Sequence, residues 1–149
     1  MNSRVLILGS FPSVKSREQM FFYGHPQNRF WRVLAGVFSC AVPQTIEEKR
    51  RFLLSNGIAL WDVIASCEIT GSSDSSIKNV VANDLRQILE AADIRKIFVN
   101  GKTAEKYYKK YTESVIGREA ICLPSTSPAN AAWSLERLTE AWQAVSESI

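Results

Sequence analysis

Cysteine and histidine are scarce in this chain, whose 149 residues include three cysteines and one histidine. Cys40, Cys67 and Cys122 are widely spaced and form no CxxC pair, so a zinc or iron–sulfur site built only from cysteines is excluded. The single His25 likewise excludes a histidine-rich metal site and a mechanism that needs two histidines. We therefore expect reduced, buried thiols and neither a metal nor a cofactor.

Long apolar runs are also missing. No stretch reaches the ~18–20 residues that a membrane-spanning helix needs. At the N-terminus, Met1-Asn2-Ser3-Arg4 leads directly into a short apolar run at residues 5–8. This start lacks the charged segment, the longer apolar region and the small-residue cleavage site of a signal peptide. We expect a cytoplasmic protein with no membrane partner.

The rest of the composition is typical of a globular protein. Hydrophobic residues make up 46% of the chain and charged residues 22%, which excludes an intrinsically disordered or fibrous protein. The length of 149 residues fits one domain, since domains cluster at about 100–150 residues. We expect a single domain over residues 1–149 and a monomer.

Positive charge is placed unevenly along the chain, although the net charge is only +3. Up to residue 46 the only acid is Glu18, and the basic residues are Arg4, Lys15, Arg17, Arg29 and Arg32. A second basic group comprises Lys102, Lys106, Lys109 and Lys110. One-sided positive charge suits an anionic partner such as a phosphate backbone. An ordinary solvated surface is the alternative.

Strand-like and helix-like segments alternate, which predicts an α/β fold with a parallel sheet covered by helices on both faces. The expected strands are residues 5–8, 58–61, 95–99 and 120–123, and the expected helices are residues 28–38, 45–56, 84–92, 101–111 and 131–146. Thr45 and Glu48 have the spacing of a capping box, and Asn83 precedes its helix as an N-cap. Residues 67–76 are rich in serine and predict a loop, followed by a short turn at 77–81.

Each expected strand is followed by a polar or turn-forming segment. These segments are residues 9–13 (GSFPS), Asp62, residues 100–103 (NGKT) and residues 124–130 (PSTSPAN). Ligands of open parallel sheets bind beyond the carboxyl ends of the strands. We therefore expect Ser10, Asp62, Asn100 and Ser125 to line one cleft. Gly-Lys-Thr at 101–103 is not a phosphate-binding P-loop, because the upstream glycine of that motif is missing.

Four segments together resemble the uracil-DNA glycosylase superfamily. Residues 8–13 (LGSFPS) are similar to its first motif, and residues 125–130 (STSPAN) to its last motif, a loop that presses on the minor groove. Residues 23–31 (YGHPQNRFW) resemble the aromatic segment of the mismatch-specific uracil glycosylases. With residues 100–104 (NGKTA), the set most resembles the hypoxanthine-DNA glycosylase branch.

This resemblance implies a three-layer α/β/α fold with a central four-stranded parallel sheet. It also implies a DNA glycosylase of base excision repair, which flips a deaminated base out of DNA and hydrolyses its N-glycosidic bond. Hypoxanthine is the expected base and uracil the second choice. The partner is DNA that contains a damaged base.

The resemblance also implies roles for individual residues. Catalysis is expected of Asn28 and Asn100. The base pocket is expected to include Phe11, Tyr23, His25 and Asp62. The expected DNA-binding residues are Ser13, Arg17, Arg29, Lys102, Ser125, Ser127 and Asn130. An ionised Asp62 would accept a hydrogen bond from a base N–H, as hypoxanthine presents at N1 and uracil at N3.

Structural roles remain open for each of these residues. Asn28 and Asn100 each precede a helix and could be simple caps. Tyr23 and Phe11 could be core residues, and Ser125 with Ser127 could simply form a turn. Asp62 could be a solvated or helix-capping aspartate, and His25 could be structural.

Three departures from the superfamily bear on its chemistry. Asp62 stands where the superfamily carries a base-reading asparagine after the second strand. Phe11 stands where familiar members carry an Asp or Asn that positions water, and Ser125 stands where strong uracil glycosylases carry a histidine. Both favour the alternative of a non-catalytic nucleic-acid or nucleotide-binding module. A small-molecule hydrolase is a third possibility, but no nucleophile-elbow motif is visible.

Overall fold

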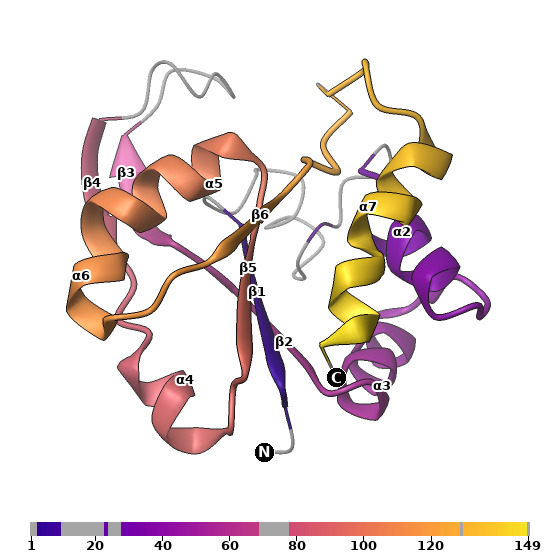
Figure 1. Cartoon of the computed structure of the whole chain (residues 1–149), viewed down its shortest axis with the longest axis horizontal. Helices are drawn as coiled ribbons and strands as arrows, with labels where there is room; N and C mark the ends of the chain where they lie inside the picture. The colour runs from indigo at the N-terminus through magenta and orange to yellow at the C-terminus, as the bar shows by residue number, and fades with distance from the viewer. Residues whose placement is uncertain (1–2, 10–22, 24–27, 69–77, 129, 149) are drawn as a thin grey trace.

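The computed structural model describes residues 3–9, 23, 28–68, 78–128 and 130–148 (Figure 1). Its main sheet has the strand order β2-β1-β5-β6, and all of its neighbouring strands are parallel. The strands are β1 (Val5–Gly9), β2 (Ile58–Asp62), β5 (Lys96–Asn100) and β6 (Ile121–Leu123). The predicted four-stranded parallel sheet is therefore confirmed, with every strand end within one residue of its expected position.

Helices cover both faces of this sheet, which gives the three layers seen in Figure 1. One face carries α2 (Phe30–Val37), α3 (Ile46–Ser55) and α7 (Leu135–Glu147). The other face carries α4 (Arg86–Ala91), α5 (Lys102–Tyr107) and the π-helical turn η2 (Tyr108–Thr112). Because side chains alternate along a strand, Val5 and Ile7 of β1 face the first layer while Leu6 and Leu8 face the second.

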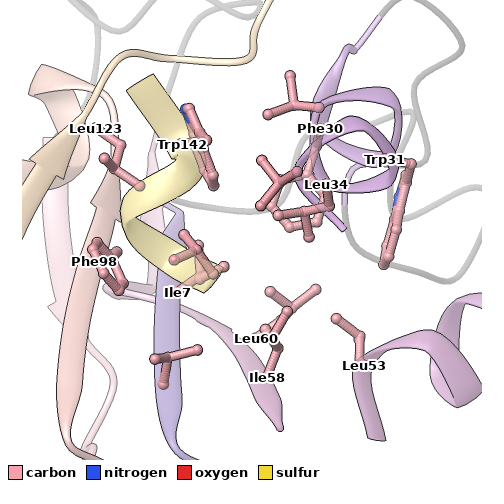
Figure 2. Close-up of a cluster of buried hydrophobic side chains, with 14 of the residues drawn as sticks. Ile7, Phe30, Trp31, Leu34, Leu53, Ile58, Leu60, Phe98, Leu123 and Trp142 are labelled. Carbon is pink, nitrogen blue, oxygen red and sulfur yellow. The ribbon is translucent and has the colours of Figure 1, made fainter. Parts of the chain in front are cut away.

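Aromatic side chains fill the core under α2 and α7 (Figure 2). The fully buried rings of Phe30 and Trp142 meet edge to face, with 5.8 Å between their centroids. The indole N–H of Trp142 donates to the carbonyl of Pro124 at 2.9 Å. This bond ties α7 to the start of the segment that follows β6, which is one of the segments expected to form the site.

The helix starts depend on local capping. The predicted capping box of α3 is confirmed, because Thr45 Oγ1 accepts from the Glu48 amide at 3.0 Å while the Glu48 carboxylate accepts from the Thr45 amide. The prediction for Asn83 is wrong. Its amide donates to the Asp62 carbonyl at 2.7 Å, and Asp84 instead accepts from the Arg86 amide at the start of α4.

The prediction of a loop and turn over residues 67–81 is also wrong within the described part. β3 (Ile64–Glu68) and β4 (Lys78–Ala82) form a two-stranded antiparallel sheet. Pairing of backbone N–H and C=O groups stabilises these strands. The sequence does not reveal this pairing, because it is rich in serine and lacks a regular alternation of apolar and polar residues.

Helix lengths and thiol burial also differ from expectation. After α5 and η2 the chain remains helical through α6 (Glu113–Ile116) and ends at Gly117 with φ 65°. The helix expected from residue 131 begins at Leu135, because Ser134 caps it by accepting from the Arg137 amide at 3.2 Å.

Cys40 is exposed and Cys122 is half-buried, so the expectation of buried thiols is wrong for these two. No helix within the described residues is both long and apolar enough to cross a membrane.

Candidate functional site

Polar residues gather at the edge of the sheet where the parallel strands end. Asp62 is the last residue of β2 and pairs in register with Gly9 of β1. Asn100 is the last residue of β5 and pairs with Leu123, directly before the segment that starts at Pro124. Asp62 and Asn100 therefore lie at the same edge, as the parallel-sheet rule predicts. Ser10, the fourth residue expected there, lies outside the described residues.

The two candidate catalytic asparagines are connected through Thr126, which is completely buried. The Thr126 hydroxyl lies 2.9 Å from Asn28 Oδ1 and 3.0 Å from Asn100 Nδ2. The Thr126 amide donates to Asn100 Oδ1 at 3.1 Å. One threonine thus contacts both asparagines, which come from segments 72 positions apart in the sequence (100 − 28).

These contacts show which of the two asparagines caps a helix. The Asn28 side chain does accept from the Phe30 amide at 2.9 Å, so it contributes to the start of α2. Asn100 makes no cap bond to α5, whose N-cap residue is Gly101. Its amide is used instead to bind Thr126. Sequence reasoning singled out neighbouring Ser125 and Ser127 and missed Thr126, because nothing in residues 125–130 indicates which hydroxyl is buried.

Tyr23 and Asp62 approach the backbone of Gly9 closely. A Cβ atom at Gly9 would lie 2.7 Å from Asp62 Oδ1 and 3.0 Å from Tyr23 Oη, so a larger residue would force these side chains to move. The Tyr23 ring stacks on Phe30 with 4.0 Å between centroids, so one face of this ring packs against the core. Tyr23 adopts the left-handed backbone conformation, with φ 54°, which is uncommon for a bulky residue and is concentrated at functional turns.

The electrostatics of Tyr23 and Asp62 follow from their burial. Desolvation raises the pKa of Asp62 to about 7. Burial, and then the negative charge of Asp62, also raise the pKa of Tyr23 well above its ordinary value, while the Asn100 side chain opposes this shift. The Tyr23 hydroxyl is buried near the Asn100 side chain, and among the described residues it makes no hydrogen bond of regular geometry. A buried, unpartnered hydroxyl beside a carboxyl group is suited to contact a polar ligand.

Arg29 holds the segment that follows β6. Its guanidinium donates to the carbonyls of Ser127 at 2.9 Å and Asn130 at 3.0 Å, and also to the carbonyl of Trp133. The Arg29 backbone amide adds a bond to the Thr126 carbonyl at 3.1 Å. The side chain therefore faces the protein, which differs from the phosphate contact predicted for it.

The other predicted residues of this segment form a turn. The Ser127 amide donates to Ser125 Oγ at 3.1 Å, and Asn130 Nδ2 donates to the Ser125 carbonyl at 3.0 Å. A Cβ atom at Gly101, whose φ is 93°, would lie 2.9 Å from Ser125 Cβ, so the turn packs directly on the start of α5. Lys102, at that start, is exposed.

Four predicted site residues lie outside the described residues, and their roles remain predictions. These are Phe11, Ser13, Arg17 and His25. Within the part of the chain that is described, no group of three or more His, Cys, Asp and Glu side chains could hold a metal ion.

Comparison with known proteins identifies the family of this chain. The model of the uracil DNA glycosylase superfamily matches residues 1–146, so the chain belongs to this superfamily. A protein of Methanosarcina acetivorans named hypoxanthine DNA glycosylase is 36% identical over 146 residues, which are 97% of this chain and 90% of that protein. A Methanosarcina barkeri protein of the same name is 33% identical over 132 residues, which are 87% of this chain and 82% of that protein.

A solved structure supports the fold. The solution NMR structure of a candidate uracil DNA glycosylase from Methanosarcina acetivorans is similar to this chain with a TM-score of 0.82 and 36% identity. The match covers 97% of this chain and 89% of that one. The predicted uracil-DNA glycosylase-like α/β/α architecture is thereby confirmed.

Proposed function

We propose that this protein is a monofunctional DNA N-glycosylase that removes hypoxanthine from DNA. The observation that carries the proposal is the hydrogen-bonded connection of Asn28 and Asn100 at the carboxyl edge of the sheet. It occurs in a chain that is 36% identical to a protein named hypoxanthine DNA glycosylase.

The chemistry requires polar groups at such an edge. Breaking an N-glycosidic bond gives the sugar oxocarbenium-like character and leaves negative charge on the departing base. The target base must first leave the stack, which costs a few kcal/mol. Asn28 and Asn100 are polar groups held in place by hydrogen bonds, and we propose that they act on the water or on the base as preorganised groups do.

Asp62 is proposed to select the base. As a carboxylate it accepts a hydrogen bond from N1–H of hypoxanthine, whereas adenine carries an unprotonated N1 that would meet the carboxylate with a lone pair. Uracil presents a similar N–H at N3 and is the second candidate substrate. The buried Tyr23 hydroxyl beside Asp62 is a further pocket group.

The segment after β6 and the start of α5 are proposed to contact DNA. Lys102 is exposed and supplies positive charge beside the site, as a phosphate contact requires. Ser125, Ser127 and Asn130 shape the turn that meets the duplex. We assign Arg29 to holding this turn, because its guanidinium already donates to three backbone carbonyls.

Base release from labelled DNA tests the proposal. Duplexes carrying hypoxanthine, uracil or xanthine are incubated with the protein, and alkali then cleaves any abasic site. We expect strand cleavage that is fastest with hypoxanthine. Binding to these duplexes without cleavage of any of them would support the non-catalytic nucleic-acid-binding alternative instead.

A further inference from the structure

Two backbone amides determine how the side-chain amides of Asn28 and Asn100 are oriented. The Phe30 N–H points at the Asn28 side chain at 2.9 Å, and the Thr126 N–H points at the Asn100 side chain at 3.1 Å. A backbone N–H can only donate. The side-chain atom that faces it must be the oxygen in both asparagines, so neither amide can be rotated by half a turn without placing two donors against each other.

The direction of the remaining hydrogen bonds then follows. With its oxygen on the Thr126 amide, Asn100 turns its Nδ2 group to the Thr126 hydroxyl, which accepts at 3.0 Å. The hydroxyl has a single proton, and it donates this proton to Asn28 Oδ1 at 2.9 Å. The chain of donors therefore runs from Asn100 through Thr126 to Asn28.

Asn28 is left with donors and no available acceptor. Its Oδ1 already accepts from both the Phe30 amide and the Thr126 hydroxyl, which uses both lone pairs of a carbonyl oxygen. Its Nδ2 has no hydrogen-bond partner among the described residues, and the side chain is only half-buried. Orienting a water for attack needs an acceptor, so Asn28 would have to break one of its two bonds to do so.

We propose that Asn28 donates a hydrogen bond to a carbonyl oxygen of the released base, and that Thr126 is the positioning residue that holds it in this orientation. This inference rests on the proposed glycosylase function and specifies how the site acts. A donor at this point stabilises the negative charge that the base oxygen gains as the bond to the sugar breaks. It suits hypoxanthine and uracil, and it disfavours adenine, whose amino group would meet a second donor.

Replacing Asn28 by aspartate tests the donor. Asn28→Asp keeps oxygen atoms for the Phe30 amide and the Thr126 hydroxyl, and it replaces the donating NH₂ group by a second oxygen of an acceptor-only carboxylate, which also adds a negative charge. We expect the single-turnover rate of hypoxanthine release at saturating DNA to fall about a hundredfold or more, with an unfolding midpoint close to that of the unchanged protein. If Asn28 instead orients water through its oxygen, Asn28→Asp retains or increases the rate, and the inference is overturned.

Two substitutions of Thr126 test the positioning role. Thr126→Val preserves the shape of the side chain and removes the hydroxyl, whereas Thr126→Ser keeps the hydroxyl. We expect Thr126→Val to lower the maximal rate about tenfold or more without changing the DNA concentration for half-saturation, and Thr126→Ser to restore most of the rate. Equal rates per folded molecule in all three proteins, or an equal loss in both variants, would overturn the positioning role.

The unchanged protein distinguishes the two levels of failure. If it releases no hypoxanthine, the proposed function has failed. If it releases hypoxanthine and Asn28→Asp does so equally well, the function stands and the donor assignment alone is wrong.

Discussion

At the scale of single residues, the buried carboxyl group of Asp62 makes the stability of the fold depend on pH. Its folded-state pKa is about 7, against about 3.9 for an unstructured aspartate. As the pH rises, the unfolded chain loses this proton first, so the free energy of unfolding decreases between about pH 4 and about pH 7. The shift of about three pKa units corresponds to at most ~4 kcal/mol.

We therefore expect Asp62→Asn to stabilise the protein at about pH 8, because the variant has no charge to bury. The gain should disappear near about pH 4, where the aspartate is protonated in both states. Urea unfolding of the two proteins at both pH values measures this difference. A gain of the same size at both pH values would show that the stabilisation does not come from removing the charge of Asp62.

The same ionisation should control base release. If the carboxylate form of Asp62 accepts the N–H of the base, the rate rises with pH through about 7, the pKa of this group. Single-turnover rates measured across this range on hypoxanthine-containing DNA check the expectation. Asp62→Asn should lose this rise, whereas a rise that persists in the variant would belong to another group.

At the scale of elements, the hydrogen bonds of Arg29 hold the segment that follows β6, which we propose contacts DNA. Arg29→Ala removes hydrogen bonds from a charged group to three carbonyls, and such bonds contribute ~1.5–3 kcal/mol each. If the turn that contains Ser125 and Ser127 helps to open the duplex, Arg29→Ala should slow hypoxanthine release from duplex DNA more than from single-stranded DNA. The bases of single-stranded DNA need no unstacking.

Two further variants serve as controls for this prediction. Arg29→Lys keeps the charge but not the planar fork of donors, so it should restore little. Arg51→Ala removes an arginine whose ion pair with Glu47 is exposed on α3, and such pairs contribute ~0–1 kcal/mol. Full rescue by lysine, or an equal loss on both kinds of DNA, would contradict the positioning role of Arg29.

The capping box of α3 gives a prediction for stability without function. Thr45→Ala removes the acceptor of the Glu48 amide and should lower the free energy of unfolding by ~0.5–2 kcal/mol. The rate of base release per folded molecule should not change, since α3 does not contribute to the candidate site. Thermal unfolding and single-turnover kinetics on this variant provide both values.

At the scale of the whole molecule, uneven positive charge should govern DNA affinity. Lysine and arginine contacts to phosphate release counterions, so the binding constant should fall steeply as salt increases. Lys102→Ala should reduce the slope of log K against log salt by about one if Lys102 contacts a phosphate. Binding that is equal at low and physiological salt would indicate an uncharged partner.

Local patterns in the sequence determined much of the fold. The four strands of the main sheet are short apolar runs bounded by turn residues, and the capping box of α3 lies within four consecutive positions. The order of strands and helices then implied a parallel sheet, and with it the edge at which Asp62 and Asn100 meet. The motif residues also indicate the superfamily to which the chain belongs.

Only the tertiary structure decided how the site residues are used. Three sets of contacts join positions that are distant in the sequence. They are the β3–β4 pairing, the hydrogen bonds of Thr126 to Asn28 and Asn100, and the hydrogen bonds of Arg29 to backbone carbonyls. The last two sets span 26 to 104 residues. The raised pKa of Asp62 comes from burial alone. A hydroxyl or a carboxyl group has the same chemistry anywhere in the chain, so only the folded backbone sets which partners it meets and how much water it keeps.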